Sequence, residues 1–180
     1  MLILASKLLT QIYAKFINKY LKYIKKKFMP FPLEYKFISV AEEQLGFKFP
    51  EKYKAKMQIE NGGEFAISLS DEDEYEDGDD IEVWWLFPFQ DTSDVKRIKR
   101  TMEHLVAEHK STCELEDFPA NSVAIAHNGD GDYLLMRADE DSQLGEEIYL
   151  WRHEDNEFIY LLAPSIEVLI PSEDHYSNHQ

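Results

Sequence analysis

Two glycine-containing segments constrain the fold of this chain more than any other feature of its sequence. Asn61-Gly62-Gly63 follows a helical segment, and Asn128-Gly129-Asp130-Gly131-Asp132 separates two short apolar runs. Asn and Gly tolerate positive φ, so the chain can turn sharply at both places. The first segment therefore predicts a helix that turns into a strand, and the second predicts an antiparallel hairpin.

Hydrophobic periodicity places helices before and after a series of strands. Helical spacing over 37–45 ends at Gly46, which can supply a left-handed C-terminal cap. Pro50 suits the first turn of a second helix that ends before Asn61, and a short helix is expected over 165–170. Alternating or continuous apolar runs predict strands over 65–70, 81–87, 123–126, 133–136, 148–151 and 158–162.

A longer helix is predicted between the second and third of these strands. Ser93 can cap a helix over 94–110. Its inner face is expected to be Val95, Ile98, Met102, Leu105 and Val106. Helices first, then strands joined by hairpins, then a helix predict an α+β fold. We expect a mostly antiparallel sheet of about six strands with N-terminal and flanking helices.

Charge is distributed unevenly along the chain, whose formal net charge is −16. Residues 1–28 hold seven lysines and no acid, so the other 12 basic residues stand against 35 acids. Residues 29–180 therefore carry about −23 by simple counting. A body this acidic repels nucleic-acid backbones, so we expect no nucleic-acid partner. It could match a basic protein, or the charge could serve only solubility.

Residues 1–28 are expected to form a separate basic amphipathic helix. Lysines interrupt the segment too often for a membrane span. Three interpretations remain open: a helix packed on the domain or on a partner, contact with an anionic membrane surface, and a start site assigned too early, since Met29 stands just before the recognisable domain. The apolar residues predicted on one face are Leu9, Ile12, Tyr13, Phe16, Ile17, Tyr20 and Ile24.

The chain is expected to hold one main domain over 29–170, preceded by the 1–28 extension and followed by a polar tail over 171–180. Its single cysteine, Cys113, excludes an internal disulfide. The absence of an internal disulfide fits a reducing cytoplasm, which is the expected location.

Two sets of motifs in the expected domain resemble the SUKH superfamily, also called the Smi/Knr cell-wall-regulator-like family. The first set is Glu42, Leu45-Gly46, Pro50, Tyr53 and Asn61-Gly62-Gly63. The second set is the apolar run 123–126, Gly129-Asp130-Gly131-Asp132, the apolar run 133–136, and Trp151-Arg152-His153-Glu154. The resemblance covers roughly residues 34–170, as judged by the order of these motifs. Phe49 is a conservative departure, because the family usually has an aliphatic residue before the proline.

The resemblance implies an α+β domain that binds other proteins and is not an enzyme. Many bacterial members of the superfamily look like immunity proteins, which neutralise a toxin by tight binding, whereas fungal members act in cell-wall regulation. The sequence is therefore interpreted as a cytoplasmic immunity protein that binds a cognate toxin. The acidity of the chain favours a basic toxin, such as a nuclease. A regulatory or scaffolding domain without a toxin is the alternative.

The predicted toxin-binding surface rests on charge and on aromatic residues. The segment 71–80 holds eight acids in ten residues, and it could instead be a solvated loop. Trp84 and Trp85 are adjacent in a predicted strand, so one should enter the core and the other could anchor a partner unless a helix covers both. The candidate residues are Asp71, Glu72, Asp73, Glu74, Tyr75, Glu76, Asp77, Asp79, Asp80, Trp84 and Trp85.

No catalytic residue, cofactor or metal site is expected. The segment 71–80 only partly matches a calcium loop, because Glu76 stands where that loop requires glycine. Asp130 and Asp132 are expected to bond nearby backbone amides in the glycine turn. A hydrolase that used them with His127 would need a concave pocket holding all three side chains.

Overall fold

The computed structural model describes residues 30–68, 81–154 and 159–170. The predicted helix over 1–28, the acidic segment 71–80 and the polar tail over 171–180 lie outside these residues. Ser68 and Ile81, which flank residues 69–80 in the sequence, belong to strands that are described.

Helices and strands follow one another in the order that the sequence predicts. The helices are α2 (Tyr35–Leu45), α3 (Glu51–Ile59), α4 (Val95–Arg100), α5 (Leu105–Thr112) and α6 (Ile166–Leu169). The strands are β1 (Gly63–Ser68), β2 (Ile81–Leu86), β3 (Ser122–His127), β4 (Tyr133–Arg137), β5 (Ile148–Trp151) and β6 (Ile159–Ala163).

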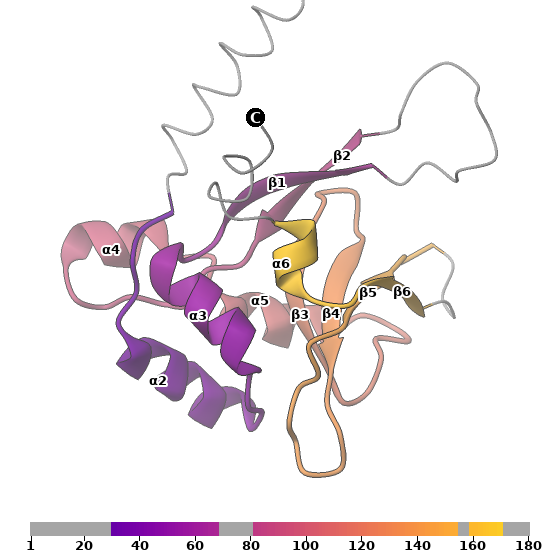
Figure 1. Cartoon of the computed structure of the whole chain (residues 1–180), viewed down its shortest axis with the longest axis horizontal. Coiled ribbons are helices and arrows are strands. Elements are labelled where there is room, and N and C mark those ends of the chain that lie inside the picture. The colour runs from indigo at the N-terminus through magenta and orange to yellow at the C-terminus, as the bar shows by residue number, and fades with distance from the viewer. Residues whose placement is uncertain (1–29, 69–80, 155–158, 171–180) are drawn as a thin grey trace, which may run out of the picture.

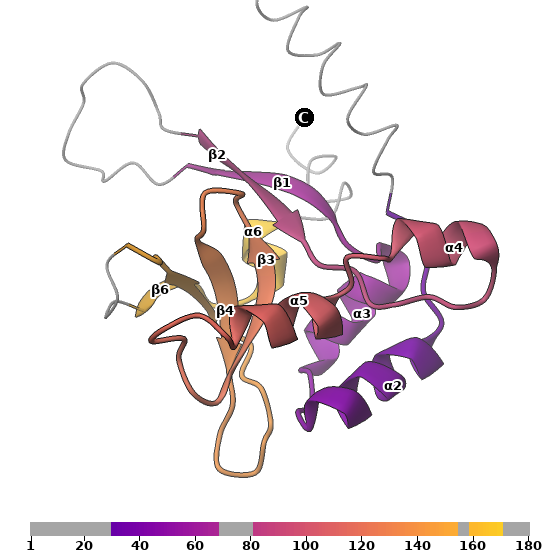
Figure 2. The same cartoon turned by 180° about the vertical axis from the view of Figure 1, so that it is seen from behind.

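The strands form one antiparallel sheet in the order β1-β2-β3-β4-β5-β6 (Figure 1). Each strand pairs with the next strand in the chain, so the sheet is a meander that curls as it is crossed. Helix α6 lies in front of the sheet in Figure 1 and contacts α3, which lies to its left, whereas α5 packs on β3 from the other side, as Figure 2 shows. The fold is therefore α+β with an antiparallel sheet of six strands, and the predicted fold class is confirmed.

The first glycine cap and the acidic residue before it act together. Gly46 adopts φ +75° at the end of α2, and its N–H donates to the carbonyl oxygen of Glu42 at 2.9 Å, which confirms the predicted cap. The buried carboxylate of Glu42 accepts from the backbone N–H of Phe49 and from Lys48 Nζ, both at 3.0 Å. Glu42 thereby fixes the course of the chain between α2 and α3.

The turn after α3 also follows the sequence prediction. Gly62 and Gly63 adopt φ values of +83° and +127°, a region that L side chains rarely occupy. A Cβ on Gly62 would lie 3.1 Å from the carbonyl oxygen of Leu86. Gly62 therefore meets two requirements, the left-handed backbone and the close approach of β2.

The predicted helix over 94–110 is wrong, because the chain breaks there into α4 and α5. Thr101 is buried at the break, where its Oγ1 accepts from the N–H of Asp91 at 3.1 Å and donates to the carbonyl of Arg97 at 2.9 Å. His104 then starts α5, since its Nδ1 accepts from the N–H of Ala107 at 3.4 Å. Asp94, rather than Ser93, caps α4.

The predicted inner face of that helix is correspondingly divided. Leu105 and Val106 on α5 are buried in the core. Val95, Ile98 and Met102 are exposed, and α4 has no buried residue. The apolar residues therefore keep a helical spacing, but only those on α5 face the core.

Candidate partner-binding face

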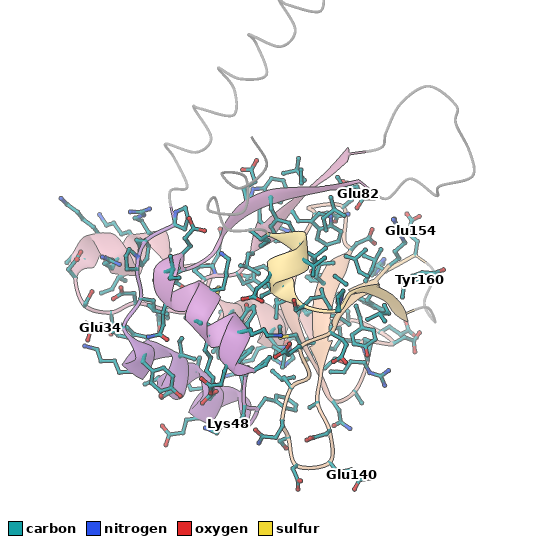
Figure 3. The ribbon with its side chains drawn as sticks, in the orientation of Figure 1. Glu34, Lys48, Glu82, Glu140, Glu154 and Tyr160 are labelled. Carbon is teal, nitrogen blue, oxygen red and sulfur yellow. The ribbon has the colours of Figure 1, made fainter. Side chains whose placement is uncertain are left out.

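The acidic segment 71–80 connects two paired strands. Ser68 at the end of β1 stands opposite Ile81 at the start of β2, so the segment leaves and re-enters the sheet at the tip of one hairpin. Glu82 projects at this end of β2 (Figure 3). The nine candidates within the segment lie outside the described residues, namely Asp71, Glu72, Asp73, Glu74, Tyr75, Glu76, Asp77, Asp79 and Asp80.

The two tryptophans of β2 point to opposite faces of the sheet. Trp84 is fully buried in the core, so its side chain cannot reach a partner. Trp85 is half-buried, and its ring lies over Gly129, where an added Cβ would meet the ring at 3.4 Å. Of the two candidates, Trp85 alone presents surface to a partner.

Trp85 begins a line of aromatic side chains that crosses the sheet. Strand register places Trp85 opposite His127, His127 opposite Tyr133, and Tyr133 opposite Trp151. Directly opposed residues of antiparallel strands share a face, so these four side chains form one row. We call Trp85, His127, Tyr133 and Trp151 the aromatic row.

Ring contacts join the aromatic row into two pairs. The ring centroids are 5.4 Å apart between Trp85 and His127, and 5.9 Å apart between Tyr133 and Trp151. Phe118, from the segment that follows α5, contacts Trp151 edge to face at 5.5 Å and covers that end of the row. Trp85, His127 and Tyr133 remain half-buried, so the other end of the row is open to a partner.

The open end of the aromatic row is apolar at its centre and acidic at its border. Burial lowers the pKa of His127 below its usual range, and the nearby Glu103 carboxylate opposes that shift. The ring is therefore neutral near pH 7, and it stacks on Phe87 at 5.2 Å. Glu64 stands opposite Trp85 on β1, so a carboxylate borders the row there as well.

The glycine turn between β3 and β4 is organised chiefly by Asn128. Its Oδ1 accepts from the N–H groups of Asp130 and Asp132 at 2.9 and 3.2 Å, the role that the sequence assigned to the two aspartates. The buried carboxylate of Asp132 accepts from Asn128 Nδ2 within the turn, and from the His153 N–H and Arg152 Nη1 outside it, each at 3.2 Å. The turn is thus tied to the chain after β5.

Arg152 extends this network to the acidic hairpin. Its Nη2 lies 3.3 Å from Glu82 Oε1, while its Nη1 holds Asp132. One guanidinium therefore joins the glycine turn to the strand that leaves the segment 71–80. Arg152 belongs to one of the family motifs, but nothing in the neighbouring sequence indicates its contact with Glu82.

The surroundings of Asp132 do not support the hydrolase alternative. Its carboxylate is occupied by Arg152, Asn128 and the His153 N–H. Two surface depressions of about 350 and 220 Å³ occur in the described part of the chain. Neither is lined by Asp130, Asp132 or His127. Among the described residues no group of His, Cys, Asp and Glu has the composition of a metal site.

The fold and its aromatic face define a small α+β domain, and comparison with protein families identifies it. The model of the SMI1 / KNR4 family (SUKH-1) matches residues 32–172. The chain belongs to this family, as the motifs of the sequence indicated. Members of the family bind partner proteins.

Two further comparisons add no relative. A search of curated proteins and a search of solved structures each gave no match. Within residues 30–68, 81–154 and 159–170, no helix has both the length and the apolar character needed to cross a bilayer.

Proposed function

We propose that this protein is a cytoplasmic immunity protein, which neutralises a basic protein toxin by covering part of it in a one-to-one complex. The observation that supports this proposal is the open end of the aromatic row. It presents Trp85, His127 and Tyr133 as a half-buried apolar centre, with Glu64 and Glu103 at the border. Protein interfaces commonly combine an apolar, aromatic centre with a polar rim.

The charge of the chain supports a basic partner. The acidic segment 71–80 begins and ends at the tip of the β1–β2 hairpin, and β2 also carries Trp85. Carboxylates near an apolar anchor accelerate association with a cationic surface, while the anchor slows dissociation. We propose that the segment 71–80 attracts the toxin and that Trp85 then holds it.

The test is co-expression with the toxin encoded beside the gene for this chain, followed by measurement of survival and of Kd. Replacement of Trp85 with alanine should weaken binding by about 2 kcal/mol, roughly 30-fold in Kd, because exposed tryptophans are common hot spots. Tyr35→Ala is the matched control, since Tyr35 is an aromatic residue 46% exposed on α2. It should leave Kd unchanged.

The acidic segment is tested separately by kinetics. Neutralising four acids, in the variant Asp71→Asn/Asp73→Asn/Asp77→Asn/Asp79→Asn, should slow association and flatten its salt dependence while leaving dissociation close to wild-type. Survival without the immunity protein, or failure of the folded wild-type chain to protect, would reject the immunity function. Either result would favour the regulatory or scaffolding role.

A further inference from the structure

Helix α4 carries exposed apolar residues that the sequence pattern assigned to the core. Val95 and Ile98 lie one turn apart on α4 and are 68% and 40% exposed. Met102, just beyond the end of the helix, is 69% exposed. Surface helices normally turn such residues inward, yet no residue of α4 is buried in the described structure.

The same helix is the most basic part of the described chain. Four of its six residues are Lys96, Arg97, Lys99 and Arg100, a third of the 12 basic residues that follow residue 28. Lys96 and Lys99 are exposed, whereas Arg97 pairs with Asp91 at 3.2 Å. Apolar and cationic side chains thus share a short exposed helix within an acidic protein.

Helix α4 also contacts Phe31 and Pro32, which follow the basic segment 1–28 in the sequence. The guanidinium carbons of Arg97 and Arg100 lie 4.1 and 4.7 Å from the ring centre of Phe31. Arg97 donates to the carbonyl of Pro32 at 2.8 Å. Residues 1–28, with seven lysines and no acid, precede this contact in the sequence.

The acidic and basic ends of the domain are separated in space. The tip of the β1–β2 hairpin, from which the segment 71–80 departs, lies on the opposite side of the molecule from α4 (Figures 1 and 2). Charges further apart than about 10 Å are largely screened at physiological salt. A partner at α4 therefore experiences mainly the local charges, among which the four basic residues of α4 outnumber Asp91, Asp94 and Glu103.

The charge of α4 selects among the surfaces that could cover it. A basic toxin would be repelled, and residues 1–28 carry the same sign of charge as α4. We propose that α4 contacts an anionic membrane surface. Val95, Ile98 and Met102 enter the boundary between headgroups and acyl chains, and Lys96 and Lys99 lie among the lipid phosphates. The tip of the β1–β2 hairpin stays directed away from the bilayer.

The test is co-sedimentation of the full chain with vesicles of phosphatidylcholine, with and without phosphatidylserine, at low and at physiological ionic strength. The wild-type chain should bind only the vesicles that contain phosphatidylserine, and more weakly at higher salt. Lys96→Gln/Lys99→Gln should weaken binding about 30-fold, at roughly 1 kcal/mol for each lysine near the surface. Ile98→Gln/Met102→Gln should weaken it about tenfold or more through lost apolar insertion.

Matched controls remove the same groups elsewhere. Lys52→Gln/Arg137→Gln changes the net charge equally, with both residues exposed outside α4. Leu161→Gln/Val168→Gln removes apolar side chains that are 61% and 59% exposed on β6 and α6. Both controls should bind vesicles as the wild type does.

Four outcomes would overturn the proposal. These are failure of the wild-type chain to bind, equal binding to neutral vesicles, unchanged binding of both α4 variants, and equal loss in the controls. If residues 1–28 cover α4 instead, Ile98→Gln/Met102→Gln would lower the melting temperature without altering vesicle binding. If a second copy covers it, the same variant would change the mass measured by light scattering.

Discussion

The side-chain amide of Asn61 bonds both backbone groups of Phe89. Asn61 Nδ2 donates to the Phe89 carbonyl oxygen, and Asn61 Oδ1 accepts from the Phe89 N–H, each at 2.8 Å. Both residues are buried, so water cannot replace these bonds. Asn61 thus fastens the end of α3 to the chain that leaves β2, a role that the turn chemistry of Asn-Gly-Gly did not reveal.

The first prediction concerns this pair. Asn61→Asp keeps the shape and one acceptor but removes the donor, so a carboxylate would face the Phe89 carbonyl. We expect the free energy of unfolding to fall by about 2–3 kcal/mol, measured by urea denaturation. Gln90→Ala, which removes an exposed amide beside Phe89, should change it by less than about 0.5 kcal/mol. Equal midpoints for Asn61→Asp and the wild type would contradict the prediction.

The second prediction concerns Gly129, which adopts φ +89° beneath Trp85. In Gly129→Ala the left-handed backbone is expected to cost about 1–2 kcal/mol of unfolding free energy. The new methyl group would also press on the ring of Trp85. Because Trp84 and Trp151 are buried, acrylamide quenching reports mainly on Trp85 and should increase.

Gly145→Ala is the control for Gly129→Ala. Gly145 does not need a left-handed backbone. Its added Cβ would press on the flexible carboxylate of the exposed Glu147, at 2.6 Å, and would lie at an ordinary contact distance of 3.7 Å from the Arg137 carbonyl oxygen. The unfolding free energy should change by no more than about 0.5 kcal/mol, with quenching unaltered. Equal behaviour of the two alanine variants would mean that neither the left-handed backbone of Gly129 nor its contact with Trp85 contributes measurably to stability.

Much of the fold can be predicted from short stretches of sequence, because each turn depends on the residues within it. Asn61-Gly62-Gly63 and the segment 128–132 both need positive φ, and the second turn sets the pairing of His127 with Tyr133. The family motifs predicted the fold class because they contain these turn residues. Each turn fixes the strand that follows it.

The remainder depends on contacts between distant parts of the chain. The break between α4 and α5 requires Asp91 to bond Thr101, and helical periodicity carries no information about that bond. The choice between Trp84 and Trp85 requires knowledge of which face of β2 the helices cover. The aromatic row could not be predicted from the sequence, because the pairing of β2 with β3 joins segments that are distant in the chain.

The third prediction concerns pH and His109. Its Nδ1 accepts from the Ala124 N–H at 3.4 Å, and burial, with a smaller effect of Lys110, lowers its pKa below the usual range. An unfolded histidine has a pKa of about 6.5, so protonation favours the unfolded chain. The stabilisation is complete above that value and is lost as pH falls through the folded pKa.

His109→Gln should therefore unfold with a weaker pH dependence than the wild type when both are titrated with urea between about pH 7.5 and 5. Lys110→Gln keeps the imidazole and removes only the smaller cause, so most of the wild-type dependence should remain. A steeper loss of stability in His109→Gln at low pH would mean that the folded pKa is raised rather than lowered.

The last prediction concerns the two carboxylates that Arg152 joins. The side chain of Asp132 is 11% exposed and that of Glu82 is 26% exposed, while Arg152 itself is 34% exposed. Solvent screens an exposed pair more strongly, so Arg152 should couple more tightly to Asp132. In double-mutant cycles with Arg152→Met, Asp132→Asn and Glu82→Gln, we expect coupling energies of about 1–2 kcal/mol for Asp132 and less than about 1 kcal/mol for Glu82.

Arg152→Met keeps the apolar stem in place, so the cycles report on charge. A larger coupling to Glu82 would show that Arg152 chiefly holds the acidic hairpin, and its loss should then also weaken toxin binding.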